Sequence, residues 1–140
     1  MPVYREGVGL TRVLEEITGH LAAANAPHEF VLIDDGSPDD SWKVITAASE
    51  RFPNIRAARL SRNFGKESAL CAGLDMADGE VVIVMDADGQ HPPSLLPEMI
   101  AIWRTGHVDI VEAVKTSRGE ETLFSKVSAG LFYLLWNKLS

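Results

Sequence analysis

The chain has 140 residues, of which 46% are hydrophobic and 24% are charged. This length and composition suit one globular domain, residues 1–140, and are too small for two buried cores. The 20 acidic residues outnumber the 13 basic ones, so the net charge is -7. Because the nucleic-acid backbone attracts positively charged proteins, we expect no nucleic-acid partner.

Short apolar runs alternate along the chain with segments whose apolar residues recur at helical spacing. We predict strands at 30–33, 55–60, 81–85 and 108–114, and helices at 9–24, 38–51, 65–77 and 93–103. The run 81–85 contains no polar residue, which is typical of a strand covered on both faces in a parallel sheet. The alternation therefore predicts an α/β fold with a mostly parallel sheet.

The segment after residue 36 carries the clearest helix-start signal. The Ser37 hydroxyl can cap free backbone amides, and Pro38 suits the first helical position. Asp39 would place a carboxylate at the positive end of the helix dipole. We therefore expect the second helix to begin at Pro38 with Ser37 as its cap.

The two ends of the chain differ from the middle. Residues 1–4 read as the last part of a strand, so we expect the chain to be truncated at its start. Residues 119–140 predict a helix with a wide apolar face, which would pack on the sheet, pair with a second copy as a homo-oligomer, or lie on a membrane surface. No apolar run reaches the roughly 18 residues of a membrane span. With one cysteine, Cys71, and no secretory signal, we expect a cytoplasm-facing protein that is soluble or peripheral to a membrane.

Polar residues follow three of the predicted strands directly. They occupy positions 34–37, 61–66 and 86–91. In a parallel sheet, ligands bind beyond the carboxyl ends of the strands. The sequence therefore predicts one binding site built from these three segments.

Asp86 and Asp88 form a D-x-D pattern at the end of the run 81–85. Alternate residues of extended chain point to the same side, so the two carboxylates would repel each other unless a cation lay between them. Oxygen ligands suit Mg²⁺ or Mn²⁺, which keep coordination positions open for substrate phosphates. Gln90 could add a third oxygen. The alternative interpretation is a solvated turn without metal.

Other strand-end residues also suit a nucleotide. Asp34 or Asp35 could accept hydrogen bonds from a base or ribose, although both also fit simple turn chemistry. Arg62 and Lys66 belong to a local cluster of cations that can attract an anionic substrate. Lys66 also begins a predicted helix, whose free amides favour phosphate. Solvated surface charge is the alternative for both cations.

Four ordered segments carry a resemblance to a known family. They are residues 2–6 (PVYRE), 34–37 (DDGS), 60–67 (LSRNFGKE) and 86–93 (DADGQHPP). Together they resemble family 2 glycosyltransferases of the GT-A fold, in the branch of dolichyl-phosphate mannose synthases and bacterial polyprenyl-phosphate hexose transferases. The resemblance covers nearly the whole chain. It implies a Rossmann-like three-layer sandwich, truncated here at both ends.

The resemblance also implies which residues bind a nucleotide-diphosphate sugar. Asp86 and Asp88 would be the catalytic residues, and Asp88 and Gln90, with Asp86 beside them, would hold the Mg²⁺ or Mn²⁺. Lys115 falls where the family often has an arginine facing the donor. The residues implied to contact the nucleotide sugar are Pro2, Tyr4, Glu6, Ile33, Asp35, Asp86, Ala87, Asp88 and Lys115.

The activity implied by the resemblance is metal-dependent transfer of a hexose from a UDP- or GDP-linked donor to a polyprenyl or dolichyl phosphate, with inversion. Because the family continues beyond residue 140, we expect this chain to be the donor-binding half, without the acceptor and membrane part. The full-length protein would act at the cytoplasmic face of a membrane, where its lipid-phosphate acceptor lies.

Two alternatives remain open from the sequence. The chain could be a nucleotide-sugar-binding module without activity of its own. It could instead be a Mg²⁺-dependent phosphoacceptor signalling domain, which also places paired carboxylates beyond a parallel strand. That second alternative does not explain the segments LSRNFGKE and DADGQHPP.

Overall fold

The structure is a computed structural model, and it describes residues 1–114. Its strands are β1 (Pro2–Val3), β2 (Phe30–Asp34) and β3 (Ile55–Arg59). Its helices are α1 (Leu10–Ala23), α2 (Ser41–Arg51), α3 (Lys66–Met76) and α4 (Leu96–Trp103), the last preceded by a 3₁₀ turn (Pro93–Leu95). The strands form one parallel sheet in the order β1-β2-β3. The predicted α/β fold with a parallel sheet is confirmed.

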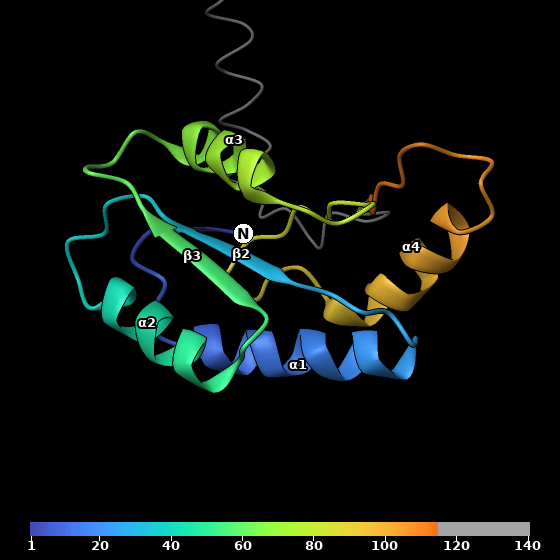
Figure 1. Cartoon of the computed structure of the whole chain (residues 1–140), viewed down its shortest axis with the longest axis horizontal. Helices are drawn as coiled ribbons and strands as arrows, with labels where there is room; N and C mark the ends of the chain where they lie inside the picture. Colours follow the sequence, from blue (N-terminus) through green and yellow to red (C-terminus); the bar gives the residue numbers. More distant parts are fainter. Residues whose placement is uncertain (115–140) are drawn as a thin grey trace, which may run out of the picture.

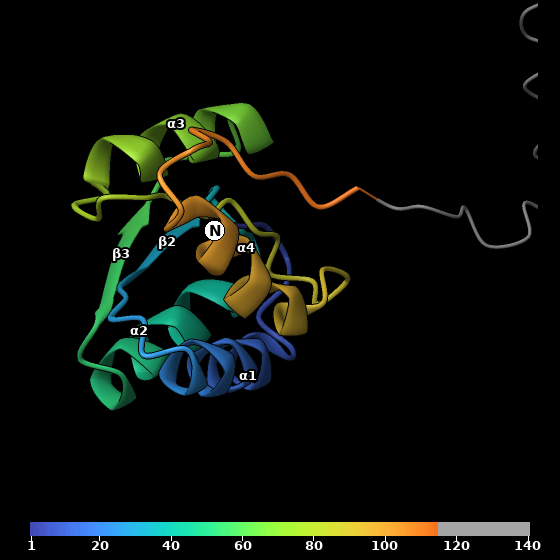
Figure 2. The same cartoon turned by 90° about the vertical axis from the view of Figure 1, so that its right-hand side faces the viewer.

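The sheet is the middle of three layers. Helix α3 covers one face, and α1 and α2 cover the other (Figure 1). The view turned by 90° shows the same separation, with α4 packed beside α1 (Figure 2). Alternate residues of β2 point to opposite faces, so Leu32 joins the core with α1, whereas Ile33 lies against α3 near Gly73. The predicted layered architecture follows from this two-sided burial of β2.

Helix α1 supplies much of the core beneath the sheet. Its buried residues are spaced so that they share one face of the helix, as the helical periodicity of the sequence predicts. They are Leu10, Val13, Leu14, Ile17 and Leu21. The observed helices otherwise begin and end within a few residues of the predicted ranges.

The strands predicted at 81–85 and 108–114 are not formed; both segments lack regular structure. The carbonyls of Met1 and Val3 accept hydrogen bonds from β2, so Pro2 faces the free edge of the sheet. Proline has no N–H to donate, and a two-residue strand offers little else to pair with. Without a partner along β1, the run 81–85 has no regular structure, and Val82 and Val84 are about half exposed.

The start of α2 also differs from the prediction. The helix begins at Ser41, and its N-cap residue, Asp40, makes no side-chain capping bond. The Asp39 carboxylate instead accepts the Ser41 N–H at 3.1 Å. Ser37 therefore does not cap α2, because its hydroxyl and its backbone groups are bound elsewhere, as described below.

Between residues 1 and 114, no helix is both long enough and apolar enough to cross a bilayer. The predicted helix at 119–140 and the candidate residue Lys115 lie outside the described residues.

Candidate functional site

Four loops meet at the carboxyl edge of the sheet. Residues 4–7 follow β1, residues 35–40 follow β2, residues 60–65 follow β3, and residues 86–91 follow the unpaired run. In a parallel sheet this is the edge at which ligands bind. The arrangement brings together the segments that the sequence singled out.

Lys66 and Asp86 form an ion pair across this edge. Lys66 is the first residue of α3, and its Nζ lies 2.7 Å from the Asp86 carboxylate. The hydrogen bond to Asp86 raises the pKa of the Lys66 ammonium above its ordinary value, so this lysine is charged at neutral pH. The pair links α3 to the D-x-D loop.

The D-x-D loop has the alternation that the sequence predicts. Met85 and Ala87 are buried, whereas Asp86 is partly exposed and Asp88 is exposed. The Asp88 Oδ1 atom accepts the backbone N–H of Gln90 at 2.8 Å. The two carboxylates therefore lie on the open side of the loop, while its other side is anchored in the core.

Glu6 adds a third carboxylate to this region. Burial, followed by the negative charges of Asp88 and Asp86, raises the pKa of Glu6 above its ordinary value, and Lys66 partly offsets the rise. An electrostatic effect of this kind requires the groups to be close. The loop after β1 and the D-x-D loop therefore share one acidic cluster, which we define as Glu6, Asp86, Asp88 and their counter-ion Lys66.

Asp35 connects β2 to the start of α3. Its side chain is buried, and its two carboxylate oxygens accept the backbone N–H groups of Phe64 at 2.8 Å and Gly65 at 2.9 Å. These bonds satisfy amides immediately before the helix. Asp35 thus holds α3 in the position from which Lys66 reaches Asp86, and a contact of Asp35 with a base or ribose stays a prediction.

The remaining predicted residues lie around this cluster. Pro2 and Ile33 are buried within the sheet, and Tyr4 is partly exposed. Arg62 is exposed, with its guanidinium 4.4 Å from the centre of the Phe64 ring. Among the described residues, Arg62 forms no ion pair with the acidic cluster.

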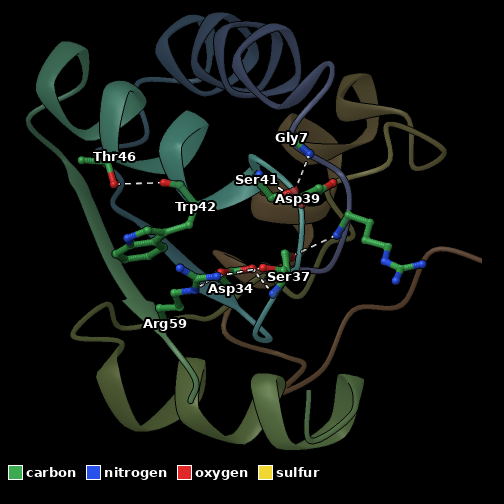
Figure 3. Close-up of polar contacts among 9 residues, drawn as sticks. Gly7, Asp34, Ser37, Asp39, Ser41, Trp42, Thr46 and Arg59 are labelled. Carbon is green, nitrogen blue, oxygen red and sulfur yellow. Dashed lines mark hydrogen bonds and ion pairs between the residues drawn. The ribbon is translucent and has the colours of Figure 1, made fainter. Parts of the chain in front are cut away.

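Three residues that the sequence did not assign as a unit form a network of which Asp34 and Ser37 are buried and Arg59 is partly exposed (Figure 3). The Asp34 side chain is 0% exposed, and its Oδ2 lies 2.9 Å from Nε of Arg59. Ser37 donates its N–H to Asp34 Oδ1 at 3.1 Å, and Arg59 Nη2 donates to the Ser37 carbonyl at 2.8 Å. The Ser37 hydroxyl accepts the N–H of Arg5 at 3.1 Å. The available sequence signal was a pair of opposite charges, Asp34 directly after the predicted strand 30–33 and Arg59 near the end of the predicted strand 55–60.

A glycine allows the loops after β2 and β3 to touch. Gly36 has φ +66°, and a Cβ on it would lie 2.4 Å from the carbonyl carbon of Arg62. Any other residue would force these two loops apart. The close approach keeps Asp35 near the amides of Phe64 and Gly65.

The donor atoms of the D-x-D loop suit a hard divalent cation. Two carboxylates and a side-chain amide are the ligand types that Mg²⁺ takes when phosphate oxygens complete its coordination. Within residues 1–114, no group of three or more His, Cys, Asp or Glu side chains is arranged as a metal site. Such a cation would be held by Asp86, Asp88 and Gln90 together with phosphate oxygens of a substrate.

Comparison with known proteins decides the family. The sequence profile described as "Glycosyl transferase family 2" matches residues 1–139. The chain belongs to this family. The fold and the segments that carried the resemblance agree with the match, which favours a glycosyltransferase over a phosphoacceptor signalling domain.

Similar proteins include a glycosyltransferase of Bacillus subtilis (strain 168), 36% identical over 135 residues, which are 96% of this chain and 42% of that protein. A glycosyltransferase of Synechocystis is 36% identical over 140 residues, covering 100% of this chain and 44% of that protein. An undecaprenyl-phosphate 4-deoxy-4-formamido-L-arabinose transferase of Yersinia enterocolitica is 34% identical over 136 residues, covering 96% and 41%. The chain thus spans less than half the length of these relatives.

Proposed function

We propose that this chain is the donor-binding part of a glycosyltransferase that moves a hexose from a nucleotide-diphosphate sugar to a polyprenyl phosphate. The observation that supports the proposal most is the acidic cluster with Lys66, which lies at the ligand-binding edge of a parallel sheet in a family 2 chain. One relative is named for transferring a sugar to undecaprenyl phosphate, which supports the choice of acceptor.

The nucleoside would bind between the loops after β1 and β2. Pro2, Tyr4 and Glu6 would line one side of it, and Ile33 and Asp35 the other. Of these, Tyr4 and Glu6 have surface open to a ligand, whereas the buried residues would act through shape and backbone. Calorimetry with UDP- and GDP-sugars decides between uridine and guanosine as the base.

The diphosphate would bind beside the D-x-D loop. Lys66 and Arg62 would supply positive charge to the diphosphate, and the backbone of Ala87 would approach the donor. Lys115, which is not among the described residues, would also face the donor. Asp86 would lie beside the sugar. Asp86, Asp88 and Gln90 would hold Mg²⁺ or Mn²⁺, which would neutralise charge on the diphosphate as it leaves.

A phosphate acceptor explains why the site needs no strong general base. The second pKa of a phosphate monoester is about 6, so the attacking oxygen is already ionised at neutral pH. That oxygen bonds to the anomeric carbon as the bond to the diphosphate breaks, and no proton has to be removed. A single displacement of this kind inverts the sugar. Because the acceptor is a lipid, the complete protein would act at the membrane surface, on the cytoplasmic face.

The second candidate is a donor-binding module without activity of its own. The loops that carry this candidate are the same ones that would hold the donor, and the chain spans 42% of the length of the Bacillus subtilis relative. Both candidates require donor binding, and only the first requires turnover.

Calorimetry with UDP- and GDP-sugars, in Mn²⁺ and in EDTA, tests donor binding. We expect Mn²⁺-dependent binding that Asp88→Ala weakens at least tenfold, with Asp75→Ala as the matched control because Asp75 is an exposed carboxylate on α3. Equal affinity of both variants would show that the D-x-D loop does not bind the donor. A transfer assay with a short polyprenyl phosphate then separates the two candidates, since turnover supports the enzyme and binding without turnover supports the module.

A further inference from the structure

The buried carboxylate of Asp34 depends on one arginine. Asp34 is fully buried, and the cation that faces it is the guanidinium of Arg59, which comes from the end of the adjacent strand β3. A buried carboxylate without a partner is strongly unfavourable. The pair is therefore the feature that allows an acidic residue at this position of β2.

The same guanidinium also holds the loop after β2. While Nε lies 2.9 Å from Asp34 Oδ2, in an ion pair without hydrogen-bond geometry, Nη2 donates to the carbonyl of Ser37 at 2.8 Å. Arginine can make both contacts because its donors are fixed in one plane. Ser37 is itself fully buried and donates its N–H back to Asp34. Three residues thus form a closed unit, which Figure 3 shows between β3 and the loop after β2.

Ser37 connects this unit to the loop after β1. Its hydroxyl accepts the backbone N–H of Arg5 at 3.1 Å. Arg5 has φ +60°, a left-handed conformation that is unfavourable for a residue with a side chain. Such a conformation persists when neighbouring contacts hold it. A second bond, from Gly7 N–H to the Ser41 hydroxyl at 3.1 Å, fixes the other end of the loop.

We propose that Arg59 is a positioning residue of the donor site, which acts through Asp34 and Ser37 to hold the left-handed turn at Arg5. This turn sets the directions of Tyr4 and Glu6, which flank Arg5 in the chain. The inference rests on the proposed function, in which those two side chains line the nucleoside pocket. Arg59 itself need not touch the donor, and its effect is to hold the pocket in shape before binding.

The chain offers a matched control on the same strand. Arg56 is also in β3, and its side chain is also 43% exposed. It pairs with Glu29 and Asp78 at the opposite end of the strand from the donor site. Arg56→Met removes the same charge and the same type of contact without affecting Ser37.

The test compares Arg59→Met, Arg59→Lys and Arg56→Met by calorimetry with UDP and GDP in Mn²⁺ and by amide hydrogen exchange at Arg5. We expect Arg59→Met to weaken nucleotide binding about tenfold and to speed exchange at Arg5 by a similar factor, because the turn loses its support. Arg59→Lys should lose less nucleotide affinity and less exchange protection at Arg5 than Arg59→Met, because lysine keeps the charge and lacks the planar guanidinium. Arg56→Met should change neither.

If Arg59→Met does not fold, Ser37→Ala replaces it, because that variant removes the acceptor for Arg5 and leaves the Asp34–Arg59 pair in place. Exchange at Arg5 and nucleotide affinity that match those of Arg56→Met would overturn the inference. If the wild type itself bound neither nucleotide, the proposed function would be refuted, and faster exchange at Arg5 in Arg59→Met would still support the link from Arg59 to Arg5.

Discussion

Asp86 pairs directly with Lys66, and the negative charges of Asp88 and Glu6 also raise the pKa of this lysine. At this scale, the chemistry of the site is an excess of negative charge that one lysine does not balance. A divalent cation or a positively charged ligand group would remove the excess, and a nucleotide diphosphate would need such a cation before it could approach.

Glu6 makes a prediction about stability and pH. Its pKa in the folded chain is raised above 4.5, so the folded state holds the proton more tightly than the unfolded state does. As pH rises from about 4.5 through the raised pKa, ionisation favours unfolding, and the wild type loses stability relative to Glu6→Gln. Melting temperatures of both proteins across this pH range measure the effect. Parallel curves would show that the pKa of Glu6 is not raised in the folded chain.

A second prediction concerns Lys66, whose substitution should affect nucleotide binding more than stability. The side chains of Lys66 and Asp86 are 59% and 24% exposed, and exposed ion pairs contribute at most about 1 kcal/mol to stability. Lys66→Met should therefore lower the free energy of unfolding by less than about 1 kcal/mol while weakening UDP or GDP binding in Mn²⁺ several-fold. Denaturant unfolding and calorimetry measure the two quantities.

Lys43→Met is the control for this variant. Lys43 also pairs with an aspartate, Asp40, at 2.7 Å, but it lies on α2, away from the acidic cluster. Lys43→Met should lower the free energy of unfolding by a similarly small amount and leave nucleotide affinity unchanged. If both lysine variants bound nucleotide as the wild type does, Lys66 would have no place in the donor site.

At the scale of elements, the loops after β2 and β3 act as one unit. Asp35 binds the amides that precede α3, and Arg59 binds the carbonyl of Ser37. Gly36 allows the two loops to approach closely. The position of α3, and therefore of Lys66, depends in part on this contact.

Gly36→Ala tests that dependence. A Cβ at Gly36 meets backbone at 2.4 Å and φ is +66°, so we expect a loss of more than about 2 kcal/mol of unfolding free energy, of which the left-handed conformation alone accounts for about 1–2 kcal/mol. Gly9→Ala is the control, because Gly9 also has a positive φ of +98° but no atom within 4 Å of the added Cβ. Urea unfolding of both variants measures the difference. Equal losses would mean that the loop contact is not tight.

At the scale of the whole molecule, the sheet acts as a scaffold for one edge. Two parallel pairings direct the ends of all three strands the same way, and helices on both faces keep the strands buried (Figure 1). The described part of the chain contains the loops that would hold a donor. The relatives are more than twice as long as this chain, which is why transfer to an acceptor is tested separately from donor binding.

Much of the fold and part of the candidate site could be predicted from the sequence. The helices, the strands β2 and β3, the parallel sheet and the family all follow from local patterns, because helical periodicity, apolar runs and short motifs depend on residues close together in the chain. The D-x-D loop was predicted for the same reason. Its pairing with Lys66 could be expected only in outline, since the sequence placed both residues at strand ends without giving a distance.

Other features were decided by tertiary structure alone. The run 81–85 has the composition of a strand, but a strand needs a neighbour with free N–H and C=O groups, and Pro2 on the free edge of β1 offers a C=O without an N–H. Ser37 has the composition of a helix cap, but its groups bind Asp34, Arg59 and Arg5. Local preferences are visible in a sequence, whereas the choice among competing hydrogen-bond partners depends on which distant segments folding brings alongside.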